Sequence, residues 1–155
     1  MPKRWIKERS EAEELLATAA VGRMGTCRDG VPYVTPVNFV YRDGRIYFHC
    51  HTHGRKLDNI KANPRVCFEV DEMRKIYRAP KACDYGCRYR SVIAFGTARL
   101  VEDPAAKLEI LDWLVAKYAA GHGYAPVTAE RAAACAVVEI RVEELTGKEN
   151  VDPLL

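Results

Sequence analysis

Residues able to perform acid–base, metal or anion chemistry gather in the stretch HCHTHGRKL, residues 49–57. It contains three histidines, His49, His51 and His53, and ends in the cations Arg55 and Lys56. Residues 45–51 alternate as a strand does, and residues 54–62 have the pattern of a short helix. Both cations therefore fall in a first helical turn, where the helix dipole disfavours them by about 0.3–1 kcal/mol each.

Two interpretations of this pair of cations remain open. A phosphate at the helix start would accept the free backbone N–H groups and pair with Arg55 and Lys56, which turns the mismatch into an anion site. Alternatively, the stretch is a solvated turn with exposed cations, because single dipole effects are small and are screened by salt.

The histidines do not make a metal site on sequence grounds. His49 and His51 share one strand face and Cys50 points to the other, and no fourth ligand follows at a zinc spacing. Cys83 and Cys87 are too far apart in sequence for the usual zinc or redox pair. No metal is therefore expected, and the absence of a Gly-x-Ser-x-Gly or phosphate-loop pattern argues against hydrolase and nucleotide-triphosphatase functions.

The elements that position these residues follow from periodicity and turn signals. Ser10 and Glu13 form a capping box for a helix over residues 10–20. The remaining expected elements are strands at 21–28, 31–42, 45–51, 66–71, 88–101 and 138–142, and helices at 54–62, 103–119 and 129–134. Asp29-Gly30 and Asp43-Gly44 predict tight hairpin turns, and Gly96 predicts a bulge. Six strands with peripheral helices favour a mainly β (α+β) fold closed as a small antiparallel barrel.

Composition places the chain among ordinary globular proteins. Its 155 residues suit one domain, 1–155, and a net charge of +3 gives no argument for a nucleic-acid or membrane partner. A small barrel that stacks single-stranded nucleic acid on Tyr33 and Tyr41 is nevertheless a competing hypothesis. The charged N-terminal stretch predicts neither a signal peptide nor a membrane span, so we expect a cytoplasmic protein with reduced cysteines.

Three blocks, TPVNFVY (35–41), residues 44–72 and YRSVIAFGTARLVED (89–103), together resemble the pyridoxamine 5′-phosphate oxidase-related flavoproteins. The branch they resemble is the Nim-type, or 5-nitroimidazole-resistance, group. The resemblance runs from about residue 22 to residue 118. It implies a six-stranded antiparallel split β-barrel, a homodimer, and FMN bound in clefts at the dimer interface.

The resemblance also implies site residues. Arg55 and Lys56 match the basic pair that holds the FMN phosphate, and His49 matches a histidine that could protonate a substrate. The other matched cofactor-binding positions are Pro36, Val37 and Asn38 along the flavin ring, His51, Thr52, His53 and Gly54 in the turn, and Ser91 on the later strand. A buried His49 tied to a backbone carbonyl is the alternative to a proton donor, and His51 and His53 depart from the family pattern.

The implied activity is an FMN-dependent oxidoreductase acting on a small planar acceptor, such as a nitroaromatic 5-nitroimidazole. NAD(P)H or another reductant would supply electrons. Two alternatives of the same fold are a flavin or haem carrier without turnover and an oxidase of the pyridoxamine-phosphate type.

Overall fold

The computed structural model describes residues 4–150. The strands are β1 Arg4–Ile6, β2 Gly22–Arg28, β3 Val31–Val37, β4 Val40–Arg42, β5 Arg45–Cys50, β6 Arg65–Tyr77, β7 Gly86–Leu100 and β8 Ala136–Asn150. The helices are α1 Arg9–Thr18, α2 Arg55–Ala62, α3 Pro104–Tyr118 and α4 Ala129–Ala133, with a 3₁₀ turn, η1, at Ala82–Asp84. Within this range no helix is both long and apolar enough to cross a membrane.

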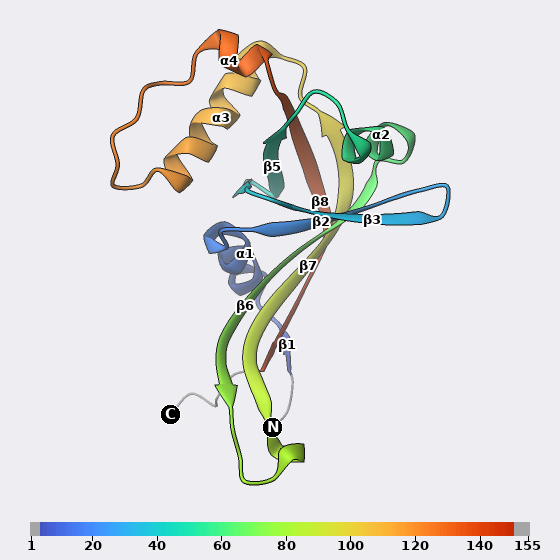
Figure 1. The fold of residues 1–155 in the computed structure, drawn as a ribbon, viewed down its shortest axis with the longest axis vertical. Coiled ribbons are helices and arrows are strands. Elements are labelled where there is room, and N and C mark those ends of the chain that lie inside the picture. Colours follow the sequence, from blue (N-terminus) through green and yellow to red (C-terminus); the bar gives the residue numbers. More distant parts are fainter. Residues whose placement is uncertain (1–3, 151–155) are drawn as a thin grey trace.

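The strands form one antiparallel sheet in the order β3-β2-β6-β7-β8-β5-β4, with β1 added on β8 (Figure 1). The two end strands, β3 and β4, are separated in sequence by Asn38 and Phe39 only. Two residues cannot span a flat sheet of this width, so the sheet curls until its ends approach. No hydrogen-bonded ladder among residues 4–150 joins β3 to β4. The fold is therefore the expected mainly β split barrel.

The strand count differs from the six predicted, because the described residues contain eight strands. The predicted strand 31–42 is interrupted at Asn38 and Phe39, and β1 was not foreseen. Phe39 breaks the strand because its ring is fully buried and its N–H donates to the Tyr118 hydroxyl, 2.9 Å away, instead of to a neighbouring strand.

The turn and bulge signals are confirmed. Asp29-Gly30 and Asp43-Gly44 have positive φ angles of 52° and 78°, and 50° and 73°, as the tightest hairpins require. The β7–β8 register shifts between Phe95 and Gly96. A Cβ at Gly96 would lie 2.1 Å from the Arg141 carbonyl oxygen, so a side chain would not fit there.

The main core fills the curl of the sheet. Phe39, Phe48 and Phe68 are fully buried within it, and the Phe39 and Phe68 rings meet edge to face at 4.8 Å. A second apolar cluster joins α3 to the outer face of β5 through Tyr47, whose ring lies 5.6 Å from that of Trp113. Neighbouring residues of β5 thus face two different apolar clusters.

The predicted capping box of the first helix is wrong. α1 begins at Arg9, and no side chain caps it, so Ser10 lies inside the first turn. The Glu13 carboxylate instead accepts from Arg9 Nε and from the Tyr41 hydroxyl, both at 2.8 Å. Helix α3, in contrast, is capped by Asp103, whose side chain accepts from Ala106 N–H at 2.8 Å.

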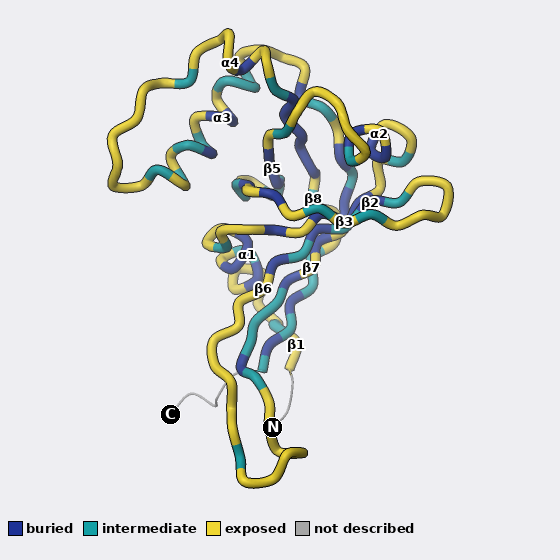
Figure 2. Tube along the Cα trace, in the orientation of Figure 1, coloured by how far each residue is buried: buried dark blue, intermediate teal, exposed yellow. Residues whose placement is uncertain are grey.

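A long arm made of the outer halves of β6 and β7 extends away from the barrel (Figure 1). Residues 71–78 and 80–86 of this arm are exposed (Figure 2). The sequence predicted strands only at 66–71 and 88–101, whereas β6 continues to Tyr77 and β7 already begins at Gly86.

Candidate functional site

Helix α2 carries the two cations of interest, and a buried hydrogen-bond chain fixes it against the sheet. Asn59 Nδ2 donates to Thr26 Oγ1 at 2.9 Å, and Thr26 Oγ1 donates to the Tyr33 carbonyl at 3.2 Å. Asn59 and Thr26 are each only 4 % exposed. Leu57 and Ile60 are buried on the inner side of the helix. The start of α2 is thereby held at a defined position relative to β2 and β3.

Arg55 and Lys56 lie in the first turn of α2, as predicted, and each is placed by an aromatic ring. The Arg55 guanidinium carbon is 4.6 Å from the Tyr33 ring centroid, and Lys56 Nζ is 5.7 Å from that of Phe48. Within the described part of the chain, neither cation forms an ion pair or side-chain hydrogen bond. Two uncompensated cations therefore share one helix start.

Gly54 shapes the turn before these cations. Its φ of 131° is rarely adopted by other residues, and its Cα faces open space. The N–H groups of Leu57 and Asp58 bond back to the Gly54 carbonyl at 2.9 and 3.1 Å. The N–H groups of Arg55 and Lys56 donate to no other described residue. Free amides, two cations and an open glycine suit a phosphate dianion. We refer to Gly54, Arg55 and Lys56 as the cation site.

The neighbouring histidines do not all turn toward this site. His49 is exposed and lies on the face of β5 that carries Tyr47, opposite the face of Phe48 and Cys50. The alternative of a buried His49 is therefore wrong. His51 and His53 are exposed, with ring centroids 6.0 Å apart, and Thr52 between them is exposed too. Among residues 4–150 no three His, Cys, Asp or Glu side chains gather as a metal site would require.

Cys50 is the last residue of β5 and lies on the same strand face as Phe48. Burial raises the pKa of its thiol, an effect that the nearby Lys56 charge partly offsets. The thiol therefore stays protonated at neutral pH and acts as a small apolar neighbour of Lys56.

The three predicted ring-contact residues lie at the end of β3 and just after it, and their environments differ. Val37 packs into the main core, whereas Pro36 is exposed on the other face. Asn38 is exposed, and its Nδ2 donates to the Ala20 carbonyl at 3.1 Å. Val37 therefore offers a ligand its backbone and not its side chain.

Sequence reasoning missed Thr35 of β3 as a candidate site residue, and it considered Tyr33 only for nucleic-acid stacking. The two lie on the same face of β3, and the Tyr33 ring meets Arg55 of α2, a contact that strand alternation alone does not identify. Thr35 Oγ1 is buried and has no hydrogen-bond partner among the described residues. A buried hydroxyl without a partner is uncommon and marks a place where a polar ligand atom would fit.

The last turn of α3 contributes two further residues that the sequence did not indicate. Lys117 Nζ donates to the carbonyls of Ala19 and Phe39, at 2.7 and 3.0 Å. Burial of this ammonium lowers the pKa of Lys117 to about 8. The hydroxyl of Tyr118 lies 2.8 Å from the Ala20 carbonyl oxygen. These contacts hold the segment between β3 and β4.

Ser91 lies away from the cation site along the sheet. It pairs with Asp71 and Lys148, and its hydroxyl is 3.5 Å from the Lys148 carbonyl oxygen. It lies six positions along β7 from Thr97, which pairs with Arg65 just after α2. That is roughly 20 Å of strand. The structure therefore does not bring Ser91 together with Arg55 and Lys56.

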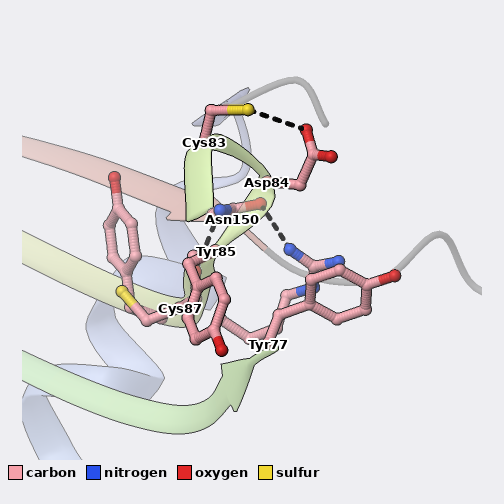
Figure 3. Close-up of a pocket in the computed structure, with 9 residues that line it drawn as sticks. Tyr77, Cys83, Asp84, Tyr85, Cys87 and Asn150 are labelled. Carbon is pink, nitrogen blue, oxygen red and sulfur yellow. Dashed lines mark hydrogen bonds between the residues drawn. The ribbon is translucent and has the colours of Figure 1, made fainter. Parts of the chain in front are cut away.

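A separate pocket of about 550 Å³ lies at the tip of the arm (Figure 3). Tyr77, Tyr85 and Tyr89 supply aromatic walls, and the Arg88 guanidinium carbon lies 5.3 Å from the Tyr77 ring centroid. Cys83 lies against Asp84 in Figure 3, while Cys87 is on another side of the pocket. This pocket is remote from α2 in the fold (Figure 1).

Several solved structures have the same fold. Flavocytochrome Anf3 from Azotobacter vinelandii is 28% identical with a TM-score of 0.83, over 99% of this chain and 71% of that one. An FAD and haem binding protein from Mycobacterium smegmatis is 21% identical with a TM-score of 0.85, over 94% and 73%. A candidate 5-nitroimidazole antibiotic resistance protein from Bacteroides thetaiotaomicron is 24% identical with a TM-score of 0.83, over 96% and 87%. The last two show the fold alone.

Sequence comparisons agree with the structural ones. An uncharacterized protein from Rhizobium meliloti is 28% identical over 67 residues, which is 43% of this chain and 44% of that protein. The match thus covers less than half of that relative. A family model described as pyridoxamine 5′-phosphate oxidase matches residues 8–149, which span almost all of the described split barrel. On this match and this fold, the chain belongs to the pyridoxamine 5′-phosphate oxidase family.

Proposed function

We propose that this protein binds FMN, with the cofactor's phosphate at the cation site, and is a flavin-dependent oxidoreductase for a small planar acceptor. The observation that carries the proposal is the pair Arg55 and Lys56, which begin a helix without an acidic partner among the described residues. Membership of the family and the similarity to flavin-binding proteins support a flavin as the phosphate-bearing ligand.

Each residue of the turn has a role in this proposal. The guanidinium of Arg55, the ammonium of Lys56 and their two free N–H groups would hold the phosphate. Gly54 gives the phosphate access, and Thr52, His51 and His53 border it. Pro36, Val37 and Asn38 would border the ring, with Val37 contributing backbone groups only.

A bound flavin supplies two-electron redox chemistry. The exposed imidazole of His49, at the end of β5, would deliver a proton to the acceptor near neutral pH. A nitroaromatic compound such as a 5-nitroimidazole suits this proposal, with NAD(P)H or another reductant as electron donor. Similarity to the Bacteroides protein motivates this choice of acceptor.

We further propose a homodimer with the cofactor at the interface. The outer face of β3, β2, β6 and β7 exposes apolar side chains, including Val34 at 61%, Phe95 at 42% and Ile93 at 40%. A groove of about 410 Å³ runs over this face. Because Ser91 lies far from its own cation site, it would contribute to a cofactor site only across such an interface. The replacements Val34→Asp and Phe95→Asp should shift the mass measured by light scattering from dimer to monomer.

The test is the visible spectrum of the purified protein, followed by mass identification of the small molecule that it releases. FMN release supports the proposal, FAD release corrects the cofactor, and a colourless protein that binds neither flavin contradicts it. Arg55→Ala with Lys56→Ala should weaken FMN binding by about 100-fold, on the scale of two lost charge-assisted contacts. Riboflavin, which lacks the phosphate, should bind the native protein and the double variant with equal affinity. Lys61→Ala, at the far end of α2, is the matched control.

A second candidate function is a flavin or haem carrier without turnover. The observation that favours it is the 28% identity to a flavocytochrome over 99% of this chain. Bleaching of the flavin band by NADH or NADPH, followed by reoxidation with a nitroaromatic compound, supports the enzyme. A haem Soret band, or a flavin that no reductant bleaches, supports the carrier. Oxidation of pyridoxamine phosphate with oxygen would instead indicate the oxidase activity for which the family is described.

A further inference from the structure

The last turn of α3 contacts two segments that are distant in sequence. Lys117 Nζ donates to the Ala19 carbonyl before β2 and to the Phe39 carbonyl between β3 and β4, at 2.7 and 3.0 Å. The Tyr118 hydroxyl accepts from Phe39 N–H at 2.9 Å and lies 2.8 Å from the Ala20 carbonyl oxygen. Two adjacent side chains thus join the two segments.

These contacts replace the strand ladder where the barrel is split. Phe39 lies between the end of β3 and the start of β4, so no neighbouring strand satisfies its N–H and carbonyl. Tyr118 accepts from its N–H, and Lys117 donates to its carbonyl. The Lys117 ammonium also lies 4.2 Å from the Phe39 ring centroid. Phe39 is therefore held by its backbone as well as by its buried ring.

Asn38, the residue before Phe39, bonds to the same set of backbone carbonyls. Its Nδ2 donates to the Ala20 carbonyl, the oxygen that also faces the Tyr118 hydroxyl. This bond sets the orientation of the carboxamide, and its Oδ1 has no partner among the described residues. Because Asn38 is exposed, the free acceptor is available to a ligand.

We propose that Lys117 and Tyr118 are positioning residues that hold Asn38 so that its Oδ1 accepts a hydrogen bond from an imide N–H of a planar ring. The inference rests on the proposed flavin site and deepens it, since the N3–H of a flavin is such a donor. Under this proposal, recognition of the ring depends on residues of α3, whereas the phosphate binds at the start of α2. A planar ligand without that N–H would lose this contact.

The test compares binding of FMN and of 3-methyl-FMN, which lacks the imide N–H, by quenching of flavin fluorescence. The native protein should prefer FMN by about tenfold, the scale of one hydrogen bond. Asn38→Ala and Tyr118→Phe should both abolish most of this preference by weakening FMN binding alone. Tyr41→Phe is the matched control, because it also removes one tyrosine hydroxyl bond, to Glu13, from the neighbouring strand β4.

The outcomes separate the two proposals. If the native protein binds no flavin, the proposed function fails and this inference fails with it. If it binds FMN but Tyr118→Phe keeps the full preference over 3-methyl-FMN, only the positioning inference is overturned. Equal losses for both ligands in Tyr118→Phe and Tyr41→Phe would also overturn it, because they indicate general loosening. Lys117→Met provides the same comparison should Tyr118→Phe fail to fold, as its thermal unfolding would reveal.

Discussion

The buried carboxamide of Asn59 donates to the hydroxyl of Thr26 at 2.9 Å, and that hydroxyl donates onward to the Tyr33 carbonyl at 3.2 Å. One polar chain thus links α2 to two strands and sets where the helix begins. Because the cations occupy the first turn of that helix, their position depends on a residue one turn further in.

Replacing Asn59 with alanine should therefore affect both stability and binding. Loss of a buried hydrogen bond should lower the free energy of unfolding by about 1–3 kcal/mol, measured with urea. The shifted helix start should also weaken FMN binding more than riboflavin binding. The exposed Lys61→Ala variant should leave both properties nearly unchanged. FMN affinity at the native level in Asn59→Ala would show that the chain does not position the cations.

Thr35→Val should stabilise the free protein. The hydroxyl is buried without a partner, and an apolar group of the same shape removes its desolvation cost, which is worth about 1 kcal/mol. Thermal unfolding of the flavin-free protein should therefore shift upward. Thr35→Ser, which keeps the hydroxyl, should give no such increase. A clear decrease in stability for the valine variant would mean that the hydroxyl is already satisfied in the native protein.

Gly54→Ala should disturb the cation site through the backbone. At a φ of 131°, an alanine carries strain of about 1–3 kcal/mol, although nothing obstructs its methyl group. We expect lower stability and weaker FMN binding, followed by urea unfolding and fluorescence titration. Gly86→Ala is the matched control, because it is also surrounded by open space and has no positive φ. Equal effects of the two substitutions would contradict the strain argument.

Lys117 should make stability depend on pH in a defined window. Burial lowers the pKa of Lys117 from 10.5 to about 8, so above pH 8 the unfolded chain holds more protons than the folded one. The stability contributed by the neutral amine is therefore present above pH 10.5 and is lost as the pH falls through 8. Urea unfolding between pH 7.5 and 9.5 should show a rise that Lys117→Met lacks. If the unfolding free energies of the native protein and of Lys117→Met changed in parallel with pH, the lowered pKa of Lys117 would be refuted.

Much of the fold follows from local patterns in the sequence. The Asp-Gly turns, the strand that begins near Val66 and the helix that begins near Asp103 each depend on residues close together in the chain, and the structure contains all three. The wrong Ser10 cap shows the limit of this reasoning. Glu13 is taken by Arg9 and by Tyr41, which is 28 residues away.

The candidate site was likewise only partly predictable from the sequence. Arg55 and Lys56 were identifiable because a cation in a first helical turn is a local mismatch, and their placement there is confirmed. His49 was identifiable by type, but its exposure and its face depend on which apolar cluster each side of β5 meets. The roles assigned to Asn38 and Ser91 stay predictions, and the structure places Ser91 far from the cation site.

The sequence by itself determined most of the strand positions, the hairpin turns and the basic helix start, because backbone preferences and side-chain periodicity act over a few residues. Only the tertiary structure decided that Phe39 interrupts a strand, that Tyr33 meets Arg55 of α2, and that Lys117 and Tyr118 bond to the backbone of Phe39. These relationships arise when the sheet curls and brings its two end strands together. Contacts between residues up to 98 positions apart follow from that closure, and no local pattern encodes them.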